Sequence, residues 1–248
     1  MILMTNIQNN GQKSKKKVLA VILARTGSRR LKNKLFKKVG NNYVLKIFLQ
    51  RLTKSKYITD FIIATTKDKR DDKIVRVAKK FNFEFFRGSK NDVFNRFYNA
   101  IIKVNKNPDL IIRANADNFL VMPTILDKDI KQMLKKDNKW DLSSPFSKNF
   151  CPFGYSLVIF KKKTISTLKK KIKKRRHKEH IENYCFENER KFKILRPKHE
   201  KSLKYQNLKL SLDTKKDLSL MRFIFKKISK IKIGQQPKFV INLMRKNV

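Results

Sequence analysis

The chain has 248 residues, and its 63 Lys and Arg against 19 Asp and Glu give a formal net charge of +44. Hydrophobic residues make up 40% of the chain, enough for a full core, so a charge-dominated disordered protein is excluded. No apolar run reaches the ~20 residues of a membrane-spanning helix, and residues 1–17 lack the apolar core of a signal peptide. Cys151 and Cys185 match no metal-ligand spacing and are too few for a disulfide framework. We expect a soluble, cytoplasmic protein without a membrane span.

The positive charge extends from Lys13 to Lys246. Clustered Lys and Arg would favour nucleic acid as a partner. However, the chain is also crowded with Asn, Ile and Phe, which like Lys have A/T-rich codons, so codon composition is the simpler explanation of the charge. The densest basic run, at 161–163 and 169–176, is typical of a solvated helix face. The charge still attracts anionic substrates, nucleotides included.

Short apolar runs alternate with segments whose apolar residues recur at helical spacing. After a polar tail at 1–17, strands are predicted at 18–24, 61–65, 83–86 and 110–112, each followed by a helix, with apolar positions within 44–52, 74–81, 93–101 and 125–134. Pro123 suits the first turn of the last of these helices. This order predicts a Rossmann-like α/β fold with a mostly parallel sheet and helices on both faces.

The alternation weakens after Trp140. Strands are predicted at 155–160 and 208–212, and a closing helix at 218–228. We therefore expect a single domain at 18–230, in which 142–210 is an acceptor-binding or dimerisation arm, followed by a C-terminal tail at 231–248.

The loop after the first strand carries the strongest chemical signal. It reads Ala24-Arg-Thr-Gly-Ser-Arg-Arg-Leu-Lys-Asn-Lys34, and ligands of open α/β sheets bind at the carboxyl ends of the strands. A Gly permits close approach to a phosphate, Ser offers a hydroxyl, and five Arg and Lys side chains supply charge. The loop is neither a Walker A loop nor a GxGxxG motif. A basic surface loop is the alternative.

The pattern Arg25-x-Gly27-Ser28-x-Arg30-Leu31-x-x-Lys34 closely resembles the A-R-x-G-S-x-R-L-P-x-K signature of the SpsF-like cytidylyltransferases, relatives of CMP-sialate and CMP-KDO synthetases with a GT-A-like nucleotidyltransferase fold. Six further fragments follow in the family's order, at 51–60, 63–66, 86–93, 109–113, 180–184 and 212–218. The resemblance implies transfer of CMP from CTP to an acidic, sialic-acid-like or KDO-like sugar with release of pyrophosphate, for surface polysaccharide or glycoconjugate synthesis. It also implies a homodimer.

Nucleotidyl transfer from CTP needs a divalent metal, Mg²⁺ or Mn²⁺, to neutralise the triphosphate. Asp117 follows the strand at 110–112 and Asp213 follows the strand at 208–212, and family members present an Asp at both places. We expect these two carboxylates to hold the metal. The alternatives are a turn residue for Asp117 and a helix cap for Asp213.

The resemblance also assigns roles around these carboxylates. Arg25, Arg30 and Lys34 would bind the triphosphate, with the lysine stabilising the leaving pyrophosphate. The nucleotide would be held by Leu23, Ala24, Gly27, Ser28, Thr65, Ser89 and Asp92, although Asp92 fits the N-cap of the next helix equally well. Arg175, Arg176 and His180 are candidates for gripping the acceptor's carboxylate, whereas His177 suits a structural role.

Two departures from the family pattern limit this interpretation. Lys32-Asn33 replaces the usual Pro-Gly, which removes a rigid turn, and 115–120 replaces T-G-D-C-P-L while keeping Asp117. These changes leave acceptor specificity and full activity open. A GT-A glycosyltransferase is one alternative function, but Asn115-Ala116-Asp117 supplies only the second Asp of its Asp-x-Asp motif. A non-catalytic protein that binds nucleic acid or an anionic surface is the other.

Overall fold

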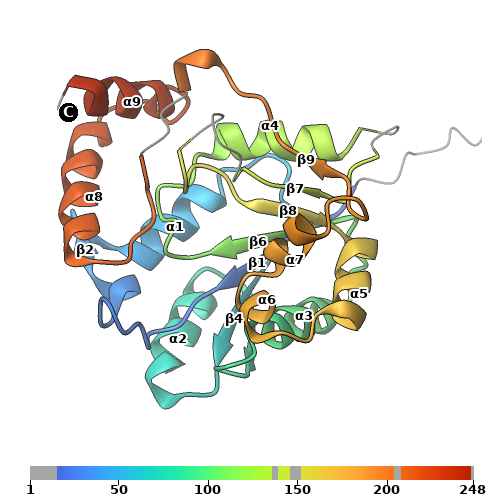
Figure 1. Ribbon diagram of the computed structural model, residues 1–248. Coiled ribbons are helices and arrows are strands. Elements are labelled where there is room, and N and C mark those ends of the chain that lie inside the picture. Colours follow the sequence, from blue (N-terminus) through green and yellow to red (C-terminus); the bar gives the residue numbers. More distant parts are fainter. Residues whose placement is uncertain (1–15, 136–138, 146–151, 204–207, 247–248) are drawn as a thin grey trace, which may run out of the picture.

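The computed structural model describes residues 16–135, 139–145, 152–203 and 208–246, and it contains a seven-stranded sheet in the order β5-β4-β1-β6-β8-β7-β9 (Figure 1). Four strands are parallel: β1 (Val18–Leu23), β4 (Asp60–Thr66), β5 (Glu84–Gly88) and β6 (Leu110–Asn115). Strand β8 (Val158–Lys161) runs antiparallel to β6 and to β7 (Leu142–Ser143), and β9 (Ile194–Leu195) pairs in parallel with β7. The predicted α/β fold with a mostly parallel sheet is confirmed.

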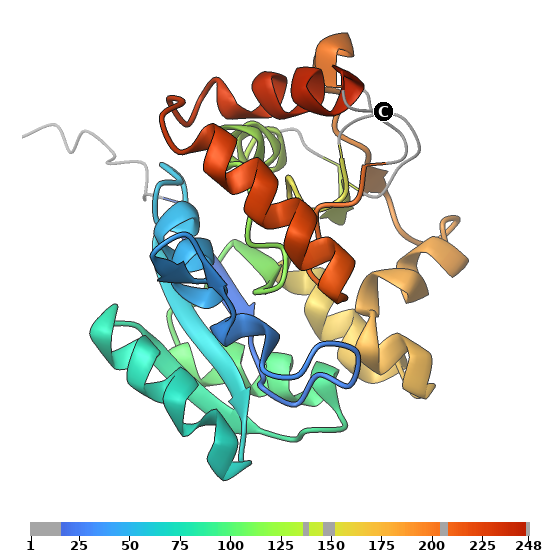
Figure 2. The ribbon, with the colours of Figure 1, turned by 90° about the vertical axis from the view of Figure 1, so that its left-hand side faces the viewer.

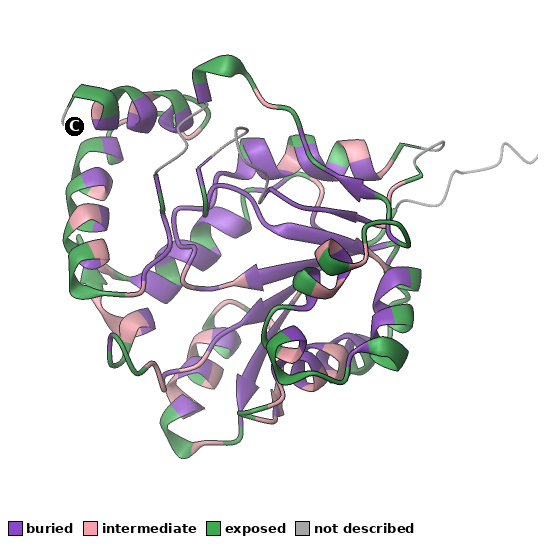
Figure 3. Cartoon of the chain, in the orientation of Figure 1, coloured by how far each residue is buried: buried purple, intermediate pink, exposed green. Residues whose placement is uncertain are grey.

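Strand β1 lies inside the sheet, between β4 and β6, and every one of its side chains is apolar and buried (Figure 3). Val18, Ala20 and Ile22 face one core cluster, whereas Leu19, Val21 and Leu23 face the other. Leu23 is in register with Ala64 of β4 and Asn115 of β6. The carboxyl ends of these three strands are therefore level, and the loops that leave them meet at one edge of the sheet.

Helices cover both faces of the sheet (Figures 1 and 2). One face packs against α1 (Val44–Leu52), α2 (Asp72–Lys80), α4 (Pro123–Met133), α8 (Lys215–Ile228) and α9 (Gln236–Lys246). The other packs against α3 (Val93–Val104), α5 (Lys162–Lys171) and α7 (Ile181–Glu187), with the short α6 (Arg175–Glu179) beside α3. The small elements are the hairpin β2 (Lys38–Val39) and β3 (Asn42–Tyr43) and the 3₁₀ turns η1 (Lys34–Phe36), η2 (Lys69–Asp71) and η3 (Lys201–Leu203).

The C-terminal segment differs from the predicted tail at 231–248. Helix α9 places Val240, Ile241 and Met244 on one face, and all three are buried in the core beside α8. Gln236, at the start of α9, accepts a hydrogen bond of 2.8 Å from the Arg51 guanidinium of α1. The segment is part of the folded domain because its apolar face completes the core. Residues 1–15 of the predicted N-terminal tail at 1–17 lie outside the described residues.

The predicted strand at 208–212 is also wrong. This segment forms an isolated bridge between Lys209 and Phe153, although Leu208, Leu210 and Leu212 are buried. The predicted strand at 155–160 is shorter, beginning at Val158. No helix within the described residues is long and apolar enough to cross a membrane.

Candidate active site

A cavity of about 860 Å³ opens where the carboxyl ends of β1 and β6 meet the loop at 24–34. Most of the site residues predicted from the sequence lie around it, although they come from segments up to 190 residues apart. The predicted residues that line the cavity are Leu23, Ala24, Arg25, Gly27, Ser28, Arg30, Lys34, Asp117, Asp213, Arg175 and His180.

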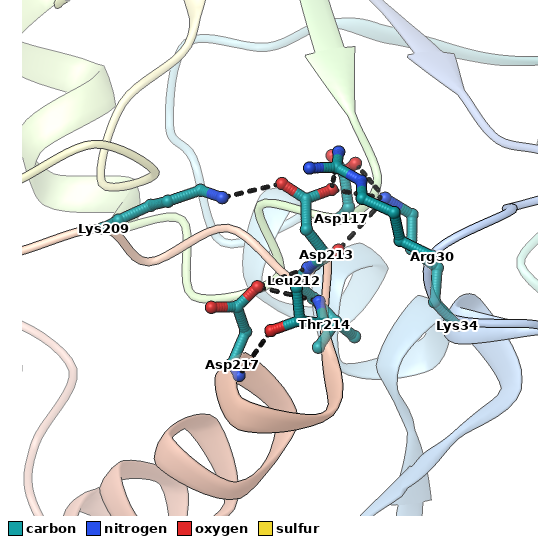
Figure 4. A network of polar contacts seen from close by, with 8 residues as sticks. All are labelled: Arg30, Lys34, Asp117, Lys209, Leu212, Asp213, Thr214 and Asp217. Atoms are coloured by element: carbon teal, nitrogen blue, oxygen red, sulfur yellow. Dashed lines mark hydrogen bonds and ion pairs between the residues drawn. The ribbon is translucent and has the colours of Figure 1, made fainter.

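Lys34 lies between the two predicted metal-binding aspartates (Figure 4). Its Nζ is 2.6 Å from Asp117 Oδ2 and 3.3 Å from Asp213 Oδ1, and it also donates to the Leu212 carbonyl oxygen at 3.0 Å. The Lys34 side chain is only 14% exposed. One ammonium group therefore joins the loop after β1, the loop after β6 and the segment before α8.

The backbone before Lys34 adopts a left-handed turn. Asn33 has φ 55° and ψ 32°, a conformation that glycine adopts freely and that Asn tolerates better than most other residues. Its side-chain Oδ1 accepts a hydrogen bond of 3.1 Å from Lys73 Nζ. Asn33 therefore forms a tight turn where the family pattern has Pro-Gly, and the replacement does not prevent Lys34 from reaching the aspartates.

Asp213 has three cationic partners. Arg30 and Lys209 lie 2.8 Å from its two carboxylate oxygens, in addition to Lys34. Burial opposes its ionisation, but hydrogen bonds from Lys209 and Lys34 hold the pKa of the carboxyl below its usual value. Thr214, rather than Asp213, caps α8, because its side chain and that of Asp217 form a reciprocal capping box. The Asp213 side chain is therefore left facing the cavity.

Asp117 is held at the same place by backbone pairing. Its carbonyl oxygen accepts a hydrogen bond of 3.0 Å from the Leu212 N–H, and the N–H of Ala116 donates to the Leu23 carbonyl oxygen. The loop after β6 is thus tied both to β1 and to the segment that carries Asp213. These bonds set the two carboxylates at one edge of the sheet.

The two carboxylates fit a hard divalent cation. Within the described residues no group of three or more His, Cys, Asp and Glu side chains forms a metal site. Mg²⁺, however, is commonly held by one or two carboxylates together with waters and substrate phosphates. Oxygen donors of this kind suit Mg²⁺ and Mn²⁺ rather than zinc. Asp117 and Asp213 therefore match the predicted metal by donor chemistry and by shared position.

A buried aspartate fixes the base of the first loop. Asp71 Oδ1 accepts hydrogen bonds from the Thr26 N–H at 2.8 Å and from its hydroxyl at 2.7 Å, and Asp71 Oδ2 accepts one from Thr66. Burial raises the pKa of Asp71, but these hydrogen bonds outweigh it and the net pKa is lowered. The sequence pattern suggested only a helix start at Asp71, so this anchoring role was missed.

Four predicted site residues do not line the cavity. Asp92 is the N-cap of α3, accepting from the Asn95 N–H at 2.8 Å, and it also pairs with Lys178 at 2.7 Å. The Ser89 hydroxyl accepts hydrogen bonds from the backbone of the same turn, and Thr65 is buried within β4. Arg176 pairs with Glu187, which also contacts the buried His177. For Asp92 and His177 the structural interpretation therefore matches the observed contacts.

The structure adds two buried arginines to the cavity wall, Arg96 of α3 and Arg113 of β6. Arg113 ends an apolar strand run and Arg96 interrupts the apolar face of a helix, and these are the sequence signals that could have revealed them. In all, eleven Lys and Arg side chains line the cavity against three carboxylates, those of Asp117, Glu179 and Asp213. The cavity is thus suited to a multiply charged anion.

A family model described as cytidylyltransferase matches residues 19–231. The chain is 38% identical over 204 residues to an uncharacterized protein of Methanocaldococcus jannaschii, an alignment that covers 82% of this chain and 81% of that protein. It is 27% identical over 216 residues to the spore coat polysaccharide biosynthesis protein SpsF of Bacillus subtilis, covering 85% and 87% of the two chains.

Solved structures show the same similarity. A cytidylyltransferase from Leptospira borgpetersenii superposes with a TM-score of 0.84 at 28% identity, covering 94% of this chain and 95% of that one. A CMP:2-keto-3-deoxy-manno-octonic acid synthetase in complex with CTP has the same fold, with a TM-score of 0.65 at 11% identity over 86% of this chain and 99% of that one.

Proposed function

The chain belongs to the cytidylyltransferase family, and on this premise we propose that it transfers CMP from CTP to an acidic sugar, releasing pyrophosphate, in the synthesis of a surface polysaccharide or glycoconjugate. The family expected from the first loop is confirmed, as is the nucleotidyltransferase class. The sugar, the metal, a homodimer and a cytoplasmic location remain predictions. The observation that carries the proposal is the convergence of Lys34, Asp117 and Asp213 on one cationic cavity.

The first loop supplies the groups for the triphosphate. Gly27 and Ser28 lie at the cavity wall, and the space beside Gly27 is open, since a Cβ built there meets no atom within 4 Å. Arg25, Arg30 and Lys34 would neutralise the phosphate oxygens, with Leu23 and Ala24 at the nucleoside end. Lys34 would stabilise charge on the departing pyrophosphate, and its position between Asp117 and Asp213 supports this role.

Asp117 and Asp213 would hold Mg²⁺ or Mn²⁺. When bound, the ion supplies charge neutralisation for the triphosphate and orients the α-phosphorus. Both carboxylates contact Lys34 in the structure, so the lysine ammonium would exchange carboxylate partners for phosphate oxygens when the nucleotide enters. Arg30 and Lys209 would keep Asp213 oriented during that exchange.

The acceptor would approach from the α6 side, where Arg175 and His180 line the cavity. A hydroxyl of the sugar attacks the α-phosphorus, a new phosphorus–oxygen bond forms, and the bond to the pyrophosphate oxygen breaks in line with it. The hydroxyl proton leaves to solvent or to a nearby base. Direct transfer requires no covalent enzyme intermediate.

Pyrophosphate release tests this proposal. The protein is incubated with Mg²⁺, a panel of sugar acids, and CTP, ATP, GTP or UTP in separate reactions. We expect release with CTP that depends on one class of sugar acid and falls by about 10²-fold or more in Asp117→Asn. Asp109→Asn is the matched control, because Asp109 also flanks β6 but pairs with Lys16 on the surface. Absence of CTP binding would contradict the proposal, and release of the nucleotide from a nucleotide sugar, with no pyrophosphate from CTP, would instead indicate a glycosyltransferase.

A further inference from the structure

Two buried arginines in this chain have very different surroundings. Arg51 is 7% exposed and is satisfied by structural partners: its nitrogens donate to the Val121 carbonyl oxygen, Gln236 Oε1 and Met122 Sδ, each at 2.8 Å. Arg96 is 2% exposed and donates to the Ser89 carbonyl oxygen, but its Nε has no hydrogen-bond partner among the described residues. Of these two, only Arg96 lines the cavity. Burial of Arg96 therefore lacks the compensation that Arg51 receives.

The charges around Arg96 increase this cost. Among the described residues no carboxylate lies within 4.0 Å of its guanidinium. Burial, and to a smaller extent the positive charge of Arg25, lowers the pKa of Arg96 to about 10. The carboxylates of Glu179 and Asp71 oppose this shift, while the charge of Arg113 adds a smaller lowering effect. Three guanidinium groups thus converge on one wall of the cavity, and an anion between them would relieve both the burial and the repulsion.

The position of Arg96 depends on a glycine. A Cβ at Gly88 would lie 2.7 Å from Phe86 Cε1 and 3.0 Å from Arg96 Cγ, so a larger residue at the end of β5 would displace the arginine stem. Arg113 is held from the other side, where it donates to the Glu179 carbonyl oxygen at 2.6 Å and lies 3.6 Å from Glu182. Packing and hydrogen bonds therefore hold both arginine side chains at the cavity, although both residues are largely buried.

Arg96 and Arg113 have different contact partners from Lys34, Asp117 and Asp213. Asp117 and Asp213 pair with Lys34, Arg30 and Lys209, and neither of them pairs with Arg96 or Arg113. Arg113 instead contacts residues 179–182, which join the short α6 to α7. That junction also carries His180, on the side from which the acceptor would enter.

We propose that Arg96 and Arg113 form a second anion subsite, which binds the carboxylate of the acceptor sugar while the triphosphate occupies the loop at 27–34. A guanidinium group pairs with a carboxylate through two parallel hydrogen bonds, so the subsite selects acidic over neutral sugars. The proposal rests on the proposed function for the identity of the acceptor. It adds the residues that would set its charge specificity.

The stability of the ligand-free protein provides a test that does not depend on activity. Arg96→Met is compared with Arg51→Met by thermal unfolding. We expect Arg51→Met to lower Tm by about 5–10 °C, because three buried acceptors lose their donor. Arg96→Met leaves Tm unchanged or raises it, because an uncompensated buried charge is removed. A loss of Tm in Arg96→Met equal to that in Arg51→Met would show that Arg96 is structural and would overturn the proposal.

Kinetics then identify the anion. With the sugar acid that supports turnover in the panel above, Arg96→Met should raise the KM for that sugar about 10-fold to 100-fold and leave the Kd for CTP within about twofold. Arg96→Lys should recover part of the loss. The methyl ester of the same sugar should bind the wild type and Arg96→Met equally weakly. A weaker Kd for CTP with an unchanged KM for the sugar would assign the arginines to the nucleotide and contradict the subsite.

The two proposals fail in different ways. No pyrophosphate release from CTP with any sugar acid would refute the proposed function, and the acceptor assignment with it. The comparison of Arg96→Met with Arg51→Met would still decide whether this wall is built for an anion.

Discussion

Asp129 allows a quantitative prediction about stability. This aspartate of α4 is fully buried, the Ser156 hydroxyl donates to its Oδ2 at 2.6 Å, and its Oδ1 lies 3.3 Å from Nε2 of His199. Burial raises the pKa of Asp129 to about 7, against smaller opposing effects of Ser156 and Lys128. Burial also lowers the pKa of His199. The raised pKa of Asp129 and the lowered pKa of His199 both favour the neutral forms of these side chains in the folded protein.

The sign of the pH dependence follows from these shifts. In the unfolded chain Asp129 titrates near its ordinary value of 3.8, whereas in the folded protein it titrates at about 7. Its stabilising contribution is complete below the unfolded pKa and is lost as the pH rises through the folded pKa. A shift of this size corresponds to roughly 4 kcal/mol.

The perturbation is Asp129→Asn, because an amide can still accept from Ser156 and donate to His199 without ionising. Urea unfolding is measured from pH 4 to pH 8.5 at constant ionic strength. As the pH rises across this range, the unfolding free energy of the variant minus that of the wild type should increase by roughly 4 kcal/mol. Asp127→Asn is the control, two residues away on α4 but partly exposed. If the difference in unfolding free energy stays constant with pH, or if the wild type becomes more stable relative to the variant towards pH 7, then Asp129 is not held neutral by burial.

Three shorter predictions concern the site and the core. Asp71→Asn should raise the KM for CTP about tenfold by freeing Thr26 in the first loop, measured in the pyrophosphate assay. Asp72→Asn is the control, because Asp72 is half-buried and pairs with Arg87 instead of Thr26. Gly154→Ala should lower the unfolding free energy by about 2 kcal/mol or more, because Gly154 has φ +103° and a Cβ there would lie 2.6 Å from the Leu210 carbonyl oxygen; an unchanged urea midpoint would contradict this. Ile241→Ala should cost about 2–5 kcal/mol if α9 completes the core, whereas Ile102→Ala, at a residue 58% exposed, should cost about 0.5 kcal/mol or less.

Strong periodicity made the first half of the fold predictable. The continuous apolar run of β1 and the helical spacing in α1 and α3 match the observed elements closely, because each buries a whole face. The segment at 208–212 alternates apolar and polar residues, a pattern that predicts a strand, but it makes only a single bridge. Phe153 makes this bridge, and the next residue, Gly154, has a positive φ that interrupts the extended backbone, so the pairing does not continue. Helix α9 was missed because it is a single short segment in which apolar residues stand among Gln, Asn, Lys and Arg, and its helical state depends on packing.

The candidate site was predictable to the extent that its residues stood next to strand ends. Lys34 and Asp117 were found this way, from a basic loop and from a carboxylate after an apolar run. Asp71 and Arg96 were not, because one resembles an ordinary helix start and the other an ordinary helix interior. Asp71 and Arg96 matter because the fold places residues from distant parts of the sequence beside them, and local spacing does not reveal these contacts.

The contact between Arg51 and Gln236 also bears on how the protein matures during synthesis. The sheet and α1 are complete in the nascent chain well before α9 is translated, and domains begin to fold as they emerge from the ribosome. Until α9 has emerged, the guanidinium group of Arg51 lacks one of its acceptors, and the core lacks Val240, Ile241 and Met244. The docking of α9 must therefore follow the synthesis of the sheet and of α1, so a chain that stalls or stops before α9 would expose an apolar strip to chaperones and proteases.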